Sequence, residues 1–486
     1  MNLNFFSIIT IGIYFLLMLV IGIYSSRKVK TSSDWMVAGK QMGLIVSTGT
    51  FLATFVGANT MISYVGAYYN QGWGGMWNHL GACISTFLGA VYFAGRLNRV
   101  GKTTLPEFLE ERYGKWQALF SSVLTIFATV LLTCVQILGG SAILSAITGL
   151  STATCAIIIS IIYGLFTVFG GMVAVAYTDT LSMGVILVGI WIVMFSLVSK
   201  AGGLVGMHQN LAINFPEKLD FFANGAMRPA MIVSLAFTWG VGNMGVPHFI
   251  TRFFICKDEK TARYSQGLTG FLFILLYVPI MLIALSGFLI MPGIQGQDNV
   301  SPILMANVAP PLVGSLMMAA IMAACISTAD SLLLLASTTF TNDIYKKFIK
   351  PDASDRQVMT MSRFVSILIG VFAVLATIFS ADVIYWIQAA GVTIMGSAIS
   401  VSVIFGFTWK RANWQGGLAS AIVGFASAMI WYALGVPGGF QPMMIATIAG
   451  AITMVLVSLA TPPPPQAMIG YFFPSKNTKE RTLSHM

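Results

Sequence analysis

The chain has 486 residues, of which 57% are hydrophobic and 9% are charged, and its formal net charge is +10. Soluble domains carry roughly 25% charged residues, so this composition excludes a soluble globular protein and predicts one that lies in a lipid bilayer. The positive charge does not indicate a nucleic-acid partner, because the basic residues fall in short loops between apolar runs, where they act as orientation signals.

Apolar stretches long enough to cross a bilayer, which takes roughly 20 helical residues, recur along the whole chain. The sequence therefore predicts an all-α polytopic membrane protein with 13 transmembrane helices. They lie near residues 5–25, 43–68, 75–96, 116–147, 152–176, 180–199, 227–250, 264–291, 308–342, 357–380, 383–409, 415–435 and 441–460. The first stretch has no basic segment before it, which favours an uncleaved helix over a signal peptide.

The basic residues predict the orientation of these helices. If alternate loops are assigned to the two sides of the membrane, 23 of the 26 Lys and Arg residues fall on one side, and only Lys200, Lys218 and Arg228 fall on the other. Since cytoplasmic loops are enriched in Lys and Arg, the N-terminus is predicted outside and the C-terminus inside. Arg252 is counted with a cytoplasmic loop, so no Lys or Arg is expected in the membrane middle. A short amphipathic helix is predicted on the cytoplasmic face at 104–115.

Two predicted spans carry residues that weaken a helix. The second contains Gly49 and the run Gly-Ala-Asn-Thr at 57–60, and the seventh contains the Gly- and Pro-rich run 239–248. Close packing of small residues is one interpretation. The other is a pair of interrupted helices, whose freed carbonyls are tolerated in a membrane only where they line a cavity. The two spans lie five helices apart and run in opposite directions, so they predict inverted repeats with a transport site between them.

The predicted organisation follows from this repeat. It comprises an N-terminal extra helix and loop (1–42), a first five-helix repeat (43–200), an external loop (201–226), a second, inverted repeat (227–409), two C-terminal helices (410–461) and a cytoplasmic tail (462–486).

The ninth span carries a group of oxygen-bearing side chains. Ala324, Ser327, Thr328 and Ser331 follow an i, i+3, i+4, i+7 spacing and share one helical face, which Asp330 flanks. Hydroxyl and carbonyl oxygens suit a hard cation such as sodium. The competing interpretation is that the Ser and Thr hydroxyls bond to carbonyls of their own helix, which leaves Asp330 unexplained.

The remaining polar and reactive residues have simpler interpretations. Asp179 lies near the predicted start of the sixth helix, where helix capping competes with ion binding. The cysteines are expected to be reduced packing residues, since neither a CxxC pair nor a His cluster accompanies them. No HExxH motif, paired catalytic carboxylates or nucleophile with a base is visible, so an enzyme is not expected.

Five motifs, spread over nearly the whole chain, occur together in one known family. They are Ala53-Thr54 with Gly57-Ala58, Gly170-Gly171-Met172 with Thr178-Asp179, the run 239–248 with Arg252-Phe253, the run 323–334 with 342–345, and 411–413 with Gly416-Gly417. The chain resembles the sodium:solute symporter family, which includes proline, pantothenate, sialic acid and sugar symporters. Several motifs look nearest to the pantothenate-permease branch.

This resemblance implies the leucine-transporter-type fold and a set of site residues. The implied sodium ligands are the carbonyls of Ala53, Val56 and Ala324 and the hydroxyls of Ser327 and Thr328. A possible second sodium site comprises Asp179, Thr328, Ser331 and, as our own addition, Asp330. The positions that match the family's solute site are Asn59, Thr60, Trp77, Asn78, Gln136, Trp239, Asn243 and Gln388. The two Trp side chains are expected to sandwich the solute, and the amides to supply hydrogen bonds.

The sequence as a whole predicts a sodium-coupled symporter that imports a small polar organic solute by alternating access. A passive channel and a proton-coupled transporter are the alternatives, although no filter-like repeat is visible. Sodium is the expected co-transported ion, and the protein is expected to function as a monomer in the lipid bilayer, in a bacterial inner membrane.

Overall fold

The computed structural model describes residues 5–27, 29–379 and 384–473. Within these ranges the chain is helical, and its β pairing is limited to an isolated bridge between Met42 and Cys256. The predicted tail beyond residue 473 lies outside the described residues. The five cysteines are free thiols, and four of them are buried.

Nine helices of the described part of the chain have 19 residues or more. They are α1 (Phe5–Ser26), α8 (Lys115–Thr148), α9 (Thr152–Lys200), α13 (Glu259–Ile290), α15 (Pro311–Thr339), α16 (Asp355–Phe379), α17 (Ile384–Thr408), α18 (Trp414–Ala433) and α19 (Pro442–Ala460). The shorter α-helices are α2 (Ser32–Val37), α3 (Leu44–Phe55), α4 (Tyr64–Gln71), α5 (Trp77–Tyr92), α6 (Ala94–Val100), α7 (Leu105–Tyr113), α10 (Gly203–Asn214), α11 (Pro229–Gly240), α12 (Pro247–Phe254), α14 (Val300–Asn307) and α20 (Gln466–Phe472). Short 3-10 and π segments are η1 (Ala38–Lys40), η2 (Asn59–Ser63), η3 (Gly72–Met76), η4 (Pro216–Leu219), η5 (Gly242–Gly245), η6 (Gln297–Asn299), η7 (Phe340–Ile349) and η8 (Pro437–Gly439).

Membrane-spanning helices dominate the described chain. Eight helices are long and apolar enough to cross a bilayer, and the number rises to ten if each of two bent pairs counts as one span. A polytopic helical membrane protein is therefore confirmed, whereas the exact number of 13 helices is not.

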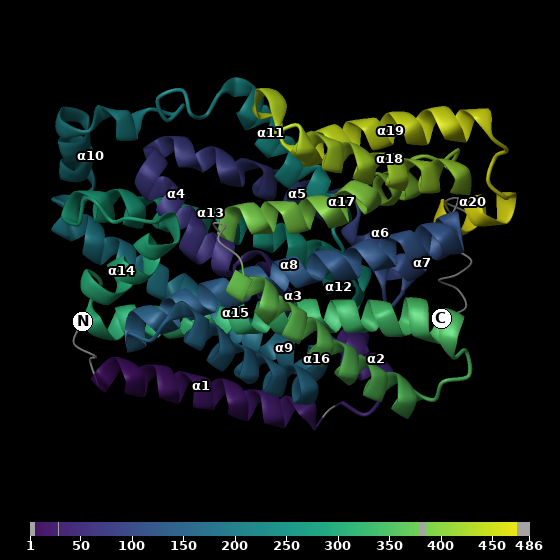
Figure 1. Ribbon diagram of the computed structural model, residues 1–486, viewed down its shortest axis with the longest axis horizontal. Coiled ribbons are helices and arrows are strands. Elements are labelled where there is room, and N and C mark those ends of the chain that lie inside the picture. The colour runs from purple at the N-terminus through teal and green to yellow at the C-terminus, as the bar shows by residue number, and fades with distance from the viewer. Residues whose placement is uncertain (1–4, 28, 380–383, 474–486) are drawn as a thin grey trace.

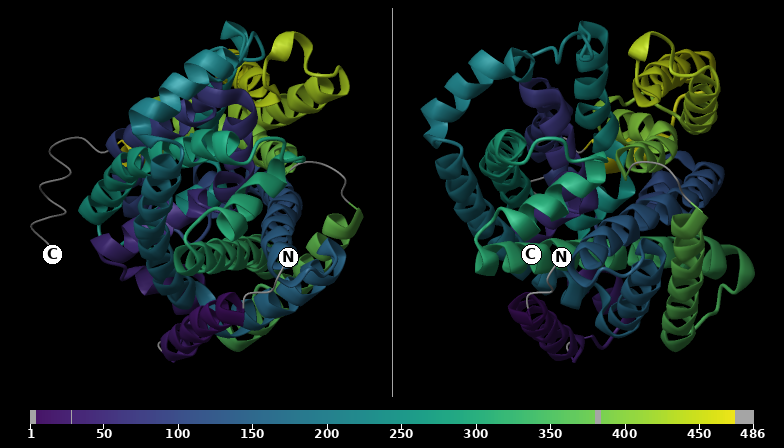
Figure 2. Two further views of the ribbon diagram at one scale, coloured as in Figure 1. Left: turned by 90° about the vertical axis from the view of Figure 1, so that its left-hand side faces the viewer. Right: turned by 60° about the vertical axis from the view of Figure 1, so that its left-hand side comes forward.

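The long helix α15 lies at the centre of the molecule, which Figures 1 and 2 show from three directions. It packs against α1, α8 and α9, and 83% of its most apolar window is buried. Helix α1 lies at one edge of the bundle, and the pair α18 and α19 lies at the opposite edge (Figure 1). A polar residue on α15 is therefore surrounded by protein and not by lipid.

The predicted break between the fifth and sixth spans lies elsewhere than expected. The structure bends α9 at Gly171, whose φ of 59° and ψ of −175° are not helical, and the span that follows covers Gly171–Lys200. The predicted boundary between the helices at 152–176 and 180–199 was wrong, because the break lies at Gly171 and not in the polar run 177–180. Asp179 is consequently in the interior of a helix, so the alternative that it caps the sixth helix does not hold.

Replacing Gly171 by Ala is expected to lower the melting temperature of the detergent-solubilised protein clearly. Its backbone conformation is open essentially to Gly alone, at a cost of about 1–3 kcal/mol for other residues. A Cβ atom would also lie 2.7 Å from the Trp35 ring. Gly184→Ala is the matched control on the same helix, since its Cβ would meet no atom within 4 Å. Equal melting temperatures for both variants would contradict this account of the bend.

The short helix predicted at 104–115 is present as α7, and Thr104 caps its N-terminus. One face of α7 is fully buried, and Arg112 is only 1% exposed. The Arg112 guanidinium donates hydrogen bonds of 3.3 Å to the carbonyls of Gly406 and Trp409 at the end of α17. Helix α7 therefore caps the C-terminal end of α17 through the Arg112 side chain.

Candidate functional site

The second span is broken where the sequence predicts it. Helix α3 ends at Phe55, the backbone of Val56 has a non-helical ψ of 81°, and the chain resumes in a π-turn at Asn59 at an angle of 61° to α3. The amide of Ala58 donates to the Gln136 side chain at 3.1 Å instead of to a helix carbonyl. Carbonyl oxygens of the last turn of α3 are left without the amide partners that a continuing helix would supply.

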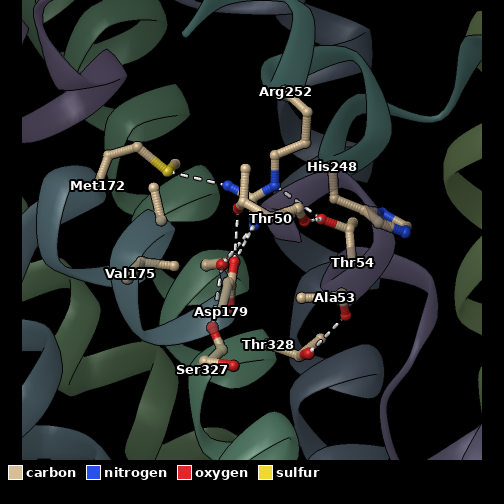
Figure 3. A network of polar contacts seen from close by, with 12 residues as sticks. Thr50, Ala53, Thr54, Met172, Val175, Asp179, His248, Arg252, Ser327 and Thr328 are labelled. Carbon is tan, nitrogen blue, oxygen red and sulfur yellow. Dashed lines mark hydrogen bonds and ion pairs between the residues drawn. The ribbon is translucent and has the colours of Figure 1, made fainter. Parts of the chain in front are cut away.

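Helix α15 presents its hydroxyl groups to this break. The Thr328 hydroxyl donates a hydrogen bond of 3.3 Å to the carbonyl of Ala53 on α3 (Figure 3). One residue earlier, the Ser327 hydroxyl donates to the Ala324 carbonyl at 3.2 Å. Ser327 and Thr328 are 3% and 6% exposed. The structure thus brings the α3 break and the Ala324–Thr328 segment together, as the family resemblance implies.

A buried ion pair lies next to this contact. The Asp179 carboxylate accepts a hydrogen bond of 2.5 Å from Thr50 and lies 3.8 Å from the Arg252 guanidinium. Both charged side chains are 1% exposed. Asp179 also interacts with the Ser327 hydroxyl, so the pair is connected directly to the hydroxyl face of α15 (Figure 3).

Arg252 is the functional candidate that the sequence analysis missed. It donates to the Thr54 hydroxyl at 2.7 Å, to the Ser331 hydroxyl at 2.5 Å and to the Met172 sulfur at 2.9 Å. The assignment of Arg252 to a cytoplasmic loop was wrong, because Pro247 starts a second helix, α12, which continues the seventh span after a bend of 47°. The apolar residues on both sides of Arg252 were the available signal for this continuation.

The four residues of the predicted second sodium site do not share one set of contacts. Asp179 and Ser331 both interact with the Arg252 guanidinium, and Thr328 bonds to Ala53. Asp330 lines a separate small cavity together with Thr178 of α9, Met18 of α1 and Ser327.

A second cavity, of about 40 Å³, lies against the breaks of α3 and of the seventh span. Five of the eight predicted solute positions line it, and they are Asn59, Thr60, Gln136, Trp239 and Gln388. Of the predicted sodium ligands, Thr328 also belongs to its lining, so the cavity borders the contact between α3 and α15 at this residue. A cavity needs about 10–15 Å³ to hold one water molecule, so this space holds only a few, and a larger solute requires its walls to move apart.

The other three predicted solute positions are not in the lining of this cavity. The Trp77 indole donates to the Phe221 carbonyl at 2.7 Å, in the segment between the two predicted repeats. Asn78 donates to the Gly75 carbonyl at 3.0 Å and accepts a hydrogen bond from Tyr385. Asn243 is buried in η5. The structure does not bring Trp77 and Trp239 together around one space, which leaves the predicted sandwich without support.

Three polar atoms that face the cavity have no hydrogen-bond partner among the described residues. They are Oδ1 of Asn59, Nδ1 of His248 and Oε1 of Gln388. Buried polar atoms are usually hydrogen-bonded, so these atoms are suited to a polar ligand. His248, Tyr64 and Tyr277 also line the cavity but were not predicted, because an isolated His or Tyr in an apolar run carries no spacing signal.

The sequence is similar to those of known membrane transporters. Residues 35–424 match the model of the sodium:solute symporter family. The osmoregulated proline transporter OpuE of Bacillus subtilis (strain 168) is 28% identical over an alignment of 486 positions. The alignment covers 96% of this chain and 97% of OpuE. The sodium/pantothenate symporter of Escherichia coli (strain K12) is 27% identical, with coverage of 94% and 97%. These identities are too similar to single out the pantothenate branch.

Among solved structures, a Na+-coupled sialic acid symporter in a substrate-bound outward-open state has the same fold. It superposes with a TM-score of 0.84 at 20% identity, over 96% of this chain and 100% of that chain.

Proposed function

Because this chain belongs to the sodium:solute symporter family, we propose that it uses the sodium gradient to import a small polar organic solute. The matched relatives are transporters, and sodium is the co-transported ion of the family. Our proposal adds the class of solute and the order of steps in the transport cycle. In this cycle, sodium binds first and stabilises the outward-open state, and the solute then permits closure and inward release.

The observation that carries the proposal is the contact between Thr328 and Ala53. It joins a broken helix, which offers backbone carbonyls, to an intact helix, which offers hydroxyls. We propose that sodium binds here to the carbonyls of Ala53, Val56 and Ala324 and to the hydroxyls of Ser327 and Thr328. A sodium ion would replace the Thr328 hydroxyl proton as the partner of the Ala53 oxygen, and would thereby fix the angle between the two helices.

The second sodium site is in competition with Arg252. The guanidinium already interacts with Asp179 and Ser331, which are two members of the predicted site. A second sodium ion would have to displace this fixed positive charge. We therefore propose one sodium ion per transport cycle as long as Arg252 stays paired with Asp179.

The solute site is proposed at the cavity lined by Asn59, Gln136, Trp239, His248 and Gln388. The unpartnered amide and imidazole atoms would give directional hydrogen bonds, and the Trp239 ring would pack against the solute. No Lys or Arg is among the described residues that line this cavity, so the bound sodium ion would have to balance the charge of a solute carboxylate.

The inverted repeat belongs to the same proposal. The two bent helix pairs, Leu44–Phe55 with Asn59–Tyr92 and Pro229–Gly245 with Pro247–Phe254, lie at the start of the proposed repeats 43–200 and 227–409. The helices outside these ranges, α1 at one end and α18 and α19 at the other, lie at opposite edges of the bundle (Figure 1). We propose that the repeats rock against each other, with the N-terminus outside and the C-terminus in the cytoplasm.

The test is uptake into proteoliposomes loaded with potassium, with labelled L-proline, pantothenate and sialic acid as probes. An inward sodium gradient is expected to drive accumulation of one of these or of a related small polar solute above equilibrium. Equal uptake in sodium, potassium and choline buffers would contradict sodium coupling. Accumulation driven by a pH gradient alone would support the proton-coupled alternative, and uptake that never exceeds equilibrium would support a channel.

A further inference from the structure

A basic pocket with aromatic walls lies where α6 and α20 meet, at the end of the molecule that carries the last described residues (Figure 1). Its volume is about 510 Å³, far larger than that of the cavity in the candidate site. Arg96 and Arg99 on α6 and Lys410 in the turn after α17 line it, together with Tyr92 and Tyr471.

The pocket has an excess of positive charge. Arg99 forms a paired hydrogen bond with Glu259, at 2.5 and 2.6 Å, which neutralises one of the three cations. Arg96 donates to the Phe407 carbonyl at 2.8 Å and keeps its charge, and Lys410 is exposed to the pocket. Two net positive charges on separate elements therefore face one space, and both can form charge-assisted hydrogen bonds with a phosphate group.

Helix α20 is held in place as a wall of this pocket. Phe472 is 8% exposed and packs edge-on against Phe108 at 5.7 Å and against Phe407 at 6.3 Å between ring centroids. This anchoring leaves the neighbouring Tyr471 at the mouth of the pocket, 55% exposed. Tyr side chains are typical of the membrane–water interface, which is where the charge asymmetry places this end of the molecule.

An apolar stripe on α5 leads to the same place. Its exposed large side chains are Leu80, Ile84, Phe87, Leu88 and Val91. Their spacing of i, i+4, i+7, i+8 and i+11 places them on one helical face, and the next residue, Tyr92, lines the pocket. A small anion in solution has no apolar part to pack against this stripe, whereas the acyl chains of a lipid would lie along it.

From these observations we propose that the pocket binds the phosphate headgroup of an anionic phospholipid, with its acyl chains along α5. Basic pockets between helix ends on the cytoplasmic side are suited to anionic headgroups. The site is remote from the candidate transport site, shares no lining residue with it, and does not depend on which solute is transported.

Native mass spectrometry of the purified full chain tests the proposal. The delipidated protein is titrated with dioleoyl phosphatidylglycerol or with dioleoyl phosphatidylcholine. We expect the first phosphatidylglycerol to bind more tightly than phosphatidylcholine. Lys410→Gln and Arg96→Gln are each expected to lower the affinity for phosphatidylglycerol about fivefold, which is the effect of one basic residue near an anionic lipid. Lys346→Gln removes an exposed charge in η7, outside the pocket, and is the matched control.

Each other outcome would overturn the proposal. Equal affinities for the two lipids would show that charge does not select the ligand. An equal loss in Lys346→Gln would show a general surface effect. Inorganic phosphate that binds alone and displaces phosphatidylglycerol would assign the pocket to a soluble anion. Since Arg96 also bonds to the Phe407 carbonyl, Lys410→Gln decides the matter if Arg96→Gln is misfolded.

Discussion

Replacing Arg252 by Gln is expected to abolish uptake and to lower the melting temperature of the protein strongly. The change leaves the Asp179 carboxylate buried without its guanidinium partner, and breaking a buried pair in this way costs about 3–5 kcal/mol. Hydrogen bonds to Thr54 and Ser331 are lost as well, so three helices lose a common contact. The measurement is thermal unfolding in detergent, with uptake in proteoliposomes.

Two further variants separate this pair from a general charge effect. Arg228→Gln removes an exposed arginine of the opposite predicted side and is expected to change neither readout. The double variant Arg252→Gln/Asp179→Asn removes both charges and is expected to recover most of the lost stability, because no unpaired charge remains. An Arg252→Gln protein as stable as the parent would contradict the buried pair.

The Arg252→Gln variant also tests whether Arg252 excludes a second sodium ion. Without the guanidinium, the Asp179 carboxylate and the Thr50, Ser327 and Ser331 hydroxyls form an oxygen-rich group that suits sodium. The melting temperature of Arg252→Gln is therefore expected to rise more steeply with sodium chloride than that of the parent, and not with potassium chloride. Identical responses to the two salts would contradict the competition between Arg252 and sodium.

Replacing Thr328 by Val is expected to raise the sodium concentration for half-maximal uptake roughly 10–100-fold. The change keeps the shape of the side chain but removes a contact to a charged group, which is worth about 1.5–3 kcal/mol. The protein should stay folded, because the lost hydrogen bond to Ala53 is a single neutral one. Uptake measured against sodium concentration, with the amount of protein in the membrane quantified, gives the shift.

Thr338→Val is the matched control, since Thr338 is buried on the same helix and its hydroxyl has no hydrogen-bond partner among the described residues. Its sodium dependence is expected to stay unchanged. An unchanged half-saturation in Thr328→Val would remove Thr328 from the sodium site, and an equal shift in both variants would indicate a general effect on α15.

The long apolar runs were sufficient to predict the helical membrane class. Local signals also predicted the break in the second span and the shared face of Ser327 and Thr328, whereas the contact between them was implied only by the family resemblance. The bend at Gly171 was placed several residues too late, because a single residue with an unusual φ leaves little trace in hydropathy. Helix capping was therefore an open alternative for Asp179, and the structure excludes it by placing this residue inside a helix.

The partner of Asp179 could not be read from the sequence. Arg252 is 73 positions further along the chain, and basic residues of membrane proteins usually lie in loops. Only the packing of α12 against the broken span shows that it is buried. The lining of the solute cavity was likewise predicted in part, because which side chains meet in it depends on how the helices are rotated and not on their spacing.

Equilibrium binding of radioactive sodium to the purified protein tests the central claim most directly, because it requires no knowledge of the solute. We expect saturable binding that excess unlabelled sodium removes and that potassium does not. Thr328→Val should weaken this binding at least tenfold, while Thr338→Val should bind sodium as the parent does. Absence of saturable binding, or equal binding by the parent and Thr328→Val, would contradict a sodium site at the contact between α3 and α15.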